Sequence, residues 1–135
     1  MITFDHTIPI LRMFDVDKAK EFYIGFLGLN LDWEHRFEDN MPVYMQVSRA
    51  GLVLHLSEHH GDGTPGTVIF VRMRGVEEFH REVSAKNYKY LRPGVEDQRP
   101  DLPFKVMNVI DPFGNRIRFA EGVADPERSE GSPSA

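Results

Sequence analysis

The sequence has no cysteine and no long hydrophobic run, and its negative charges outnumber its positive ones. Without cysteine the chain has no disulfide, no thiolate metal ligand and no cysteine nucleophile. No segment reaches the roughly 18 consecutive apolar residues of a membrane-spanning helix, so we expect no membrane partner. The formal net charge of −5 argues against nucleic acid as the main partner, whereas it suits a cationic small molecule.

We expect one domain, located in the cytoplasm. The 135 residues, of which 41% are hydrophobic, are enough to bury a real core. The first residues, MITFDHT, have neither the basic start nor the apolar segment of a secretory signal. The last residues, ADPERSEGSPSA, contain almost nothing apolar. The sequence therefore predicts a single domain at residues 1–122 and a flexible tail at residues 123–135.

The stretch VIDPFGNRIRF, residues 109–119, predicts two antiparallel strands joined by a tight turn. Pro112 fixes its own φ and donates no hydrogen bond, while Gly114 and Asn115 tolerate the positive φ that a short hairpin needs. We therefore place the turn at residues 111–115. Beyond it, polar and apolar residues alternate with the two-residue period of a strand that buries one face.

A similar turn and strand, RAGLVLHL, occur about 63 residues earlier. Upstream of each hairpin an apolar strand runs into an amphipathic helix, at residues 8–27 and again at residues 68–86. The chain is thus interpreted as one strand-helix-strands unit used twice. The first module spans about residues 1–60 and the second about residues 65–122, with a Gly-rich linker between them.

In the first module we predict a strand at residues 4–12 and then a helix that Asp15 caps and Gly28 ends. The helix has apolar residues at helical spacing, so its aromatic residues are interpreted as core packing. Two strands follow, at residues 29–37 and 43–49. The second module is predicted to contain a strand at 67–73, a helix, and a proline-containing loop at 88–103 that is placed to cover a site.

Alternation in the two strands after the first helix indicates a face suited to a ligand. In residues 29–37, one face is expected to carry Leu31, Trp33, His35 and Phe37. In residues 43–49, apolar side chains at odd positions alternate with Tyr44 and Gln46. If the apolar side chains pack on the helix, Tyr44 and Gln46 line the opposite face of the sheet. The aromatic residues there form either a binding platform or a second hydrophobic layer, and the pattern leaves both open.

Three stretches carry a resemblance to a known family: residues 8–29, residues 68–83 and residues 109–119. Together they resemble the vicinal oxygen chelate superfamily, which comprises glyoxalases, bleomycin resistance proteins and dioxygenases, and they are most similar to bleomycin resistance proteins. The resemblance implies an α+β fold of two βαβββ modules that form a curled mixed sheet, paired in a homodimer. In the drug-binding branch the N-terminal strand is often exchanged between subunits, and Pro9 falls where that branch has its proline.

The resemblance also implies where a metal would bind in the enzymes of the superfamily. The four ligand positions fall at His6, His55, Val68 and Arg118. Val68 has no donor atom, and a protonated guanidinium repels a divalent cation. Since catalytic zinc centres use three protein ligands, we expect no metal cofactor. The alternative is a divalent metal held by His6 and His55 together with a partner residue or with His59 or His60.

The function expected from the resemblance is non-catalytic binding. Such a protein sequesters a glycopeptide antibiotic of the bleomycin type, or a similar planar cation, in dimer clefts and so confers antibiotic resistance. The alternative is a metal-dependent glyoxalase or dioxygenase that uses His6 and His55. Strand parity from the implied ligand positions, with Phe104 as a substitute for a ligand-stacking ring, gives the expected binding residues: Trp33, His35, Phe37, Tyr44, Gln46, His55, Phe70, Arg72, Phe104 and Arg118.

Overall fold

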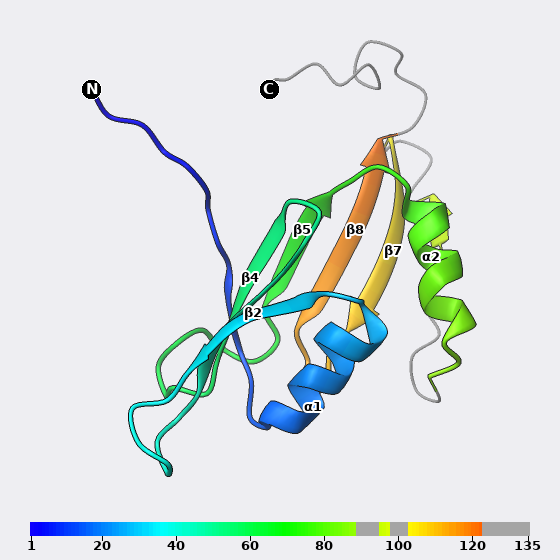
Figure 1. Cartoon of the computed structure of the whole chain (residues 1–135). Helices are drawn as coiled ribbons and strands as arrows, with labels where there is room; N and C mark the ends of the chain where they lie inside the picture. The colour runs from blue at the N-terminus through cyan, green and yellow to red at the C-terminus, as the bar shows by residue number, and fades with distance from the viewer. Residues whose placement is uncertain (89–94, 98–102, 123–135) are drawn as a thin grey trace. The chain divides into compact units, whose positions relative to one another are not determined.

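The computed structural model describes residues 1–88, 95–97 and 103–122 (Figure 1). The expected tail at 123–135 and most of the expected covering loop at 88–103 lie outside these residues. The chain divides into two compact units. The first contains Met1–Thr67 and, in addition, Asp111–Asn115, and the second contains the remaining residues from Val68 onward. Within the described ranges, no helix is long and apolar enough to cross a membrane.

The first unit has a four-stranded mixed sheet and one helical segment. The strand order is β1-β4-β3-β2, with β1 parallel to β4 and the other neighbours antiparallel. The elements are β1 (Ile10–Arg12), α1 (Val16–Lys20), the π-helical segment η1 (Glu21–Phe26), β2 (Asn30–His35), β3 (Tyr44–Arg49) and β4 (Leu52–Ser57).

The second unit repeats this topology, with strand order β5-β8-β7-β6 and β5 parallel to β8. Its elements are β5 (Val68–Arg72), α2 (Val76–Ala85), β6 (Val95–Asp97), β7 (Phe104–Ile110) and β8 (Arg116–Gly122). The turn before the last strand of each unit contains a glycine at positive φ, Gly51 at 98° and Gly114 at 88°. The prediction of two βαβββ modules in an α+β fold is therefore confirmed.

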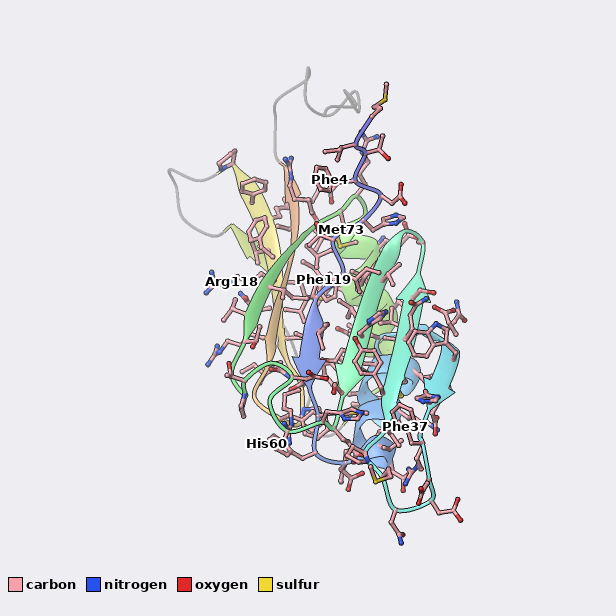
Figure 2. All side chains as sticks on the ribbon, turned by 90° about the vertical axis from the view of Figure 1, so that its left-hand side faces the viewer. Phe4, Phe37, His60, Met73, Arg118 and Phe119 are labelled. Atoms are coloured by element: carbon pink, nitrogen blue, oxygen red, sulfur yellow. The ribbon has the colours of Figure 1, made fainter. Side chains whose placement is uncertain are left out.

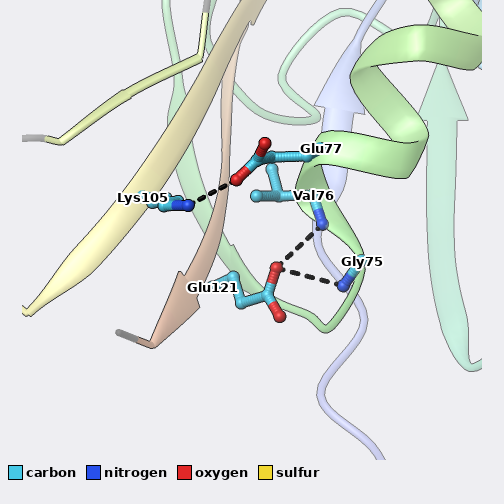
Figure 3. Close-up of polar contacts among 5 residues, drawn as sticks. All are labelled: Gly75, Val76, Glu77, Lys105 and Glu121. Carbon is cyan, nitrogen blue, oxygen red and sulfur yellow. Dashed lines mark hydrogen bonds and ion pairs between the residues drawn. The ribbon is translucent and has the colours of Figure 1, made fainter. Parts of the chain in front are cut away.

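Helix α2 begins without a capping side chain of its own, because its N-cap residue is Gly75. Glu121 on β8 takes that role, since its Oε1 atom accepts hydrogen bonds from the backbone nitrogens of Gly75 and Val76 at 3.1 and 3.0 Å (Figure 3). An ion pair between Lys105 on β7 and Glu77 joins the same turn of the helix to the sheet. In the first helix the predicted cap is confirmed, because Asp15 accepts from the backbone nitrogen of Lys18 at 2.9 Å.

The first strand is much shorter than the predicted 4–12. Only Ile10–Arg12 pairs with β4, and residues 1–7 are exposed and form no strand. Figures 1 and 2 show this segment running away from the sheet, with Phe4 on it. A segment becomes a strand only where another strand takes its backbone hydrogen bonds, and the described residues of this chain offer none to residues 4–9 beyond one bond, from His55 to Pro9.

The prediction that Leu31 and Trp33 share one face of β2 is wrong, because a β-bulge lies between them. Leu31 pairs with Val47, whereas Trp33 pairs with Gln46, so the register shifts between Leu31 and Trp33. Val47 is fully buried and points to the core, which puts Leu31 on the core side and Trp33 on the opposite side. The sequence pattern grouped the two together because a strict two-residue period has no place for an inserted residue.

The predicted turn at Asp111–Asn115 is confirmed and is tied into the first unit. Asp111 closes it with two backbone hydrogen bonds, and its Oδ1 atom accepts from the backbone nitrogens of Phe113 and Asn115 at 2.8 Å each. The buried hydroxyl of Tyr23 donates to Asp111 Oδ2 at 2.6 Å. Asn115 Nδ2 donates to the backbone oxygen of Arg12 at 2.9 Å. The turn is thus held by side chains from η1 and by the backbone of β1.

Removal of the Tyr23 hydroxyl should destabilise the protein. Tyr23→Phe keeps the ring but takes one donor from the buried Asp111 carboxylate, so we expect the free energy of unfolding in urea to fall by about 1–3 kcal/mol. Burial, followed by the charge and the hydrogen bond of Asp111, raises the pKa of Tyr23 well above its ordinary value of 10.0. The neutral phenol therefore makes its full contribution to the free energy of unfolding below pH 10.0. This contribution is lost as the pH rises through the raised pKa of Tyr23. Tyr23→Phe should lose this alkaline component. An unchanged alkaline profile in the variant would contradict the assignment.

Candidate functional site

A pocket of about 370 Å³ lies on the face of the first sheet that is opposite its core. We call it the aromatic pocket. It is lined by Trp33, His35, Phe37, Tyr44, His59 and Asp62. The side chains of Val43, immediately before β3, and of Met45 and Val47 on β3 are fully buried. Tyr44 and Gln46 must therefore point to the pocket side, as the sequence predicted.

Two rings of the aromatic pocket, Trp33 and Tyr44, are stacked with nearly parallel planes, and we call this stacked pair the flat wall. Trp33 and Tyr44 stand on neighbouring strands with ring centroids 5.9 Å apart and planes only 10° from parallel. His55 on β4 meets both rings edge to face, at 5.4 Å from Trp33 and 5.1 Å from Tyr44. Trp33 is 42% exposed and Phe37 is 71% exposed. The wall is therefore open to a ligand ring, and Figure 2 shows Phe37 near one end of the strands.

A chain of hydrogen bonds runs behind this wall. The Tyr44 hydroxyl lies 2.7 Å from His55 Nδ1, His55 Nε2 lies 3.0 Å from Gln46 Oε1, and Gln46 Nε2 donates to Asp32 Oδ2 at 2.9 Å. Burial lowers the pKa of His55, so its imidazole is neutral at neutral pH. Hydrogen bonds from Ser48 and Gln46 lower the pKa of Asp32, which is therefore ionised.

Two lining residues, His59 and Asp62, were not among the predicted binding residues. Ser57 Oγ donates to Asp62 Oδ2 at 2.8 Å and accepts from the backbone nitrogen of His59 at 3.0 Å, which folds this loop back onto β4. Burial, and then the charge of Asp62, raises the pKa of Tyr44. The residue that could have pointed to this loop in the sequence is Gly63. Its φ is 69°, and a Cβ atom at this position would lie 3.0 Å from the backbone oxygen of Ile10, so the loop packs closely there.

The ten predicted binding residues fall into two groups. Six lie on the first unit, four as lining of the aromatic pocket, with Gln46 and His55 hydrogen-bonded to it or to each other. The other four lie on the second unit. There Phe70 meets Phe104 edge to face at 5.4 Å, and the Arg72 guanidinium lies 5.2 Å from the centre of the Phe104 ring. Arg118 pairs with Phe70 across β8 and β5 and is exposed (Figure 2).

The donor set does not fit a metal. Both ring nitrogens of His55 are engaged by Tyr44 and Gln46, which leaves no lone pair for a ligand bond. His6 is exposed on the N-terminal segment that forms no strand. Among the residues that the structure describes, no three His, Asp or Glu side chains are grouped so as to hold an ion. Val68 and Arg118, the remaining implied positions, supply no usable donor.

The purified protein is accordingly expected to contain no stoichiometric divalent cation. The measurement is elemental analysis of protein prepared without chelator, with His6→Ala as a matched variant. About one Zn, Ni, Mn or Fe per chain in the wild type, lost in His6→Ala, would contradict the prediction and restore a metal site.

Each βαβββ module has one parallel strand pair, β1 with β4 and β5 with β8. Together with the aromatic face of the first sheet, these modules define a class of small α+β protein. A sequence profile described as "Glyoxalase superfamily protein" matches residues 1–126. The chain belongs to the glyoxalase superfamily. Comparison with curated protein sequences gives no match.

Solved structures show the same fold. One is a bleomycin-binding protein in complex with bleomycin, 21% identical, with 88% of this chain and 99% of that one covered at a TM-score of 0.66. Another is the bleomycin-binding protein of Streptomyces verticillus in complex with copper(II)-bleomycin, at 23% identity, 90% and 99% coverage and a TM-score of 0.64. A glyoxalase family protein from Bacillus anthracis is 18% identical, with 90% and 99% coverage and a TM-score of 0.66.

Proposed function

We propose that this protein is a non-catalytic binding protein that sequesters a planar cationic ligand, such as a glycopeptide antibiotic of the bleomycin type, and thereby confers antibiotic resistance in the cytoplasm. The observation that carries the proposal is the flat wall of Trp33 and Tyr44 beside the carboxylate of Asp62. Two structures of the same fold are bleomycin-binding proteins. The shared fold supports the class of ligand, and the low sequence identity leaves the particular drug to experiment.

The aromatic pocket has the chemistry that a planar cation requires. Stacking contributes roughly 0.5–1.5 kcal/mol per ring pair beyond area burial. A cation over an aromatic face gains about 0.5–2 kcal/mol, with the larger value where water is excluded. Asp62 adds a negative charge at the pocket, and the net charge of −5 attracts cations from a distance.

We further propose that the protein works as a homodimer. The N-terminal segment carries three exposed apolar side chains, Met1, Ile2 and Phe4, and a second copy gives them a place to be buried. The second sheet also exposes an apolar and basic face. Val68 and Phe70 are 47% and 50% exposed there, and Arg116 and Arg118 have no ion pair within the described ranges. This basic face is complementary in charge to the first sheet of another copy, which carries Asp32 and Asp62, so a dimer cleft combines both groups of predicted binding residues.

Titration with metal-free bleomycin tests the binding role. Trp33 is the only tryptophan of the chain, so quenching of its fluorescence reports on the aromatic pocket alone. We expect saturation at one or two sites per dimer and an affinity at least about tenfold lower in Phe70→Ala and Phe104→Ala. Trp33→Phe is followed by calorimetry, because it removes the fluorophore.

Phe14→Ala is the matched control, since Phe14 is about as exposed as Phe70 and belongs to neither group of predicted binding residues. Its affinity should equal that of the wild type. Absence of any response up to high micromolar drug removes bleomycin as the ligand. An equal loss in Phe14→Ala and Phe70→Ala argues for a general loss of folding instead of a lost contact.

Light scattering at micromolar concentration tests the assembly. We expect a mass of about twice the 15.6 kDa of the chain. Phe70→Asp, which puts a charge on the exposed face of β5, should shift the mass toward the monomer, whereas Glu34→Gln should not. A wild-type mass near 15.6 kDa contradicts the dimer.

A further inference from the structure

We propose that the aromatic pocket selects ligands whose cationic group carries an N–H bond, because the hydrogen-bond chain from Asp32 through Gln46 and His55 holds the Tyr44 oxygen as an acceptor. This inference rests on the proposed function of the same pocket and specifies the chemistry of its ligand. It also makes Gln46 and Asp32 positioning residues for specificity, although neither lines the pocket.

The direction of the hydrogen-bond chain is set at Asp32, the member farthest from the Tyr44 hydroxyl. An ionised carboxylate has no hydrogen to donate, so Asp32 Oδ2 can only accept, and the Gln46 atom 2.9 Å from it must be the amide nitrogen. The Gln46 oxygen then faces His55, at 3.0 Å from Nε2. Because an amide oxygen also only accepts, His55 Nε2 must carry a hydrogen. The reverse orientation of Gln46 would set its oxygen against the carboxylate.

The same logic continues to the pocket. A neutral imidazole has one hydrogen, and in His55 that hydrogen is on Nε2, so Nδ1 is a bare acceptor. The Tyr44 hydroxyl, 2.7 Å from Nδ1, must donate its single hydrogen to it. What Tyr44 can still offer to a ligand is an oxygen lone pair. A phenol that is normally free to act as donor or acceptor is thus restricted to accepting.

The other polar groups of the pocket agree with this polarity. Asp62 accepts from Ser57 through Oδ2 and adds a negative charge to the lining. His35 and His59 can present either a donor or an acceptor, so they do not oppose it. Two acceptors beside a flat aromatic wall match a planar cation with N–H bonds, such as a protonated amine or amidinium. A fully alkylated cation can stack on the same wall but leaves both acceptors without partners.

The experiment compares two planar dyes of nearly equal shape. Both 9-aminoacridine and 10-methylacridinium are aromatic cations, but only the first carries N–H bonds. We expect the wild type to bind 9-aminoacridine at least about tenfold more tightly, as expected for a hydrogen bond to a charged group. Tyr44→Phe should remove this preference by weakening 9-aminoacridine alone. Gln46→Met, which keeps the length of the side chain and removes its polar atoms, should reduce the preference as well, and Asp32→Asn should restore part of it relative to Asp32→Ala.

Glu34→Gln is the matched control. Glu34 is on β2, like Asp32, but it forms an ion pair with Lys20 on the helix side of the sheet. It should keep the full preference. A readout without any ligand is the ¹⁵N chemical shift of the His55 ring, which should report the Nε2–H tautomer in the wild type and a mixture in Gln46→Met. The Nδ1–H tautomer in the wild type would overturn the inference whatever the binding data.

The outcomes also separate this inference from the function on which it rests. Equal affinity of the wild type for the two dyes overturns the selection of N–H cations but leaves a site for planar cations. Failure of both dyes to bind, in protein whose amide spectrum shows it folded, overturns the inference and the proposed function together.

Discussion

The two-residue period of β3 is the constraint on which both the stability of the first unit and its pocket depend. Val43, Met45 and Val47 are fully buried, so the side chains between them must face the other way. A slip of one residue in the register would bury Tyr44 and Gln46 and expose the core side chains, at a cost of several buried apolar groups. The packing that stabilises the sheet therefore also fixes which side chains face the pocket.

The turn at Asp111–Asn115 differs from the corresponding turn of the first unit in the contacts that stabilise it. The corresponding turn in the first unit is made by Ala50 and Gly51 at positive φ. In the second, Asp111 and Asn115 replace simple turn chemistry with a buried network that includes Tyr23 and the backbone of Arg12. A buried carboxylate is tolerated only where its acceptor sites are filled, and here Asp111 receives hydrogen bonds from side chains and from the backbone. The repeat is therefore structural, while the stabilising contacts differ between its two copies.

Both ring nitrogens of His55 are engaged by other side chains of the first unit. At this position the family resemblance implied a metal ligand, but Nδ1 of His55 lies against Tyr44 and Nε2 against Gln46. In the arrangement that we propose, the imidazole fixes the direction of the hydrogen bond that the Tyr44 hydroxyl makes. The proposed binding role therefore depends on the aromatic face, through stacking, charge and hydrogen-bond direction.

The sequence by itself determined the modular fold, the Asp15 cap, the turn at 111–115 and the outward parity of Tyr44 and Gln46, because each follows from local backbone preferences or from a short period of burial. The expected face of Leu31 was wrong, since a bulge is an irregularity in pairing that only the partner strand reveals. The length of the first strand was also wrong, because strand formation at residues 4–9 depends on a neighbour that local pattern does not specify. Only the tertiary structure brought Asp62 and His59 to the pocket and connected Asp32 to Tyr44. Those contacts join residues of different strands and loops, and the direction of a hydrogen bond is decided by which atoms meet.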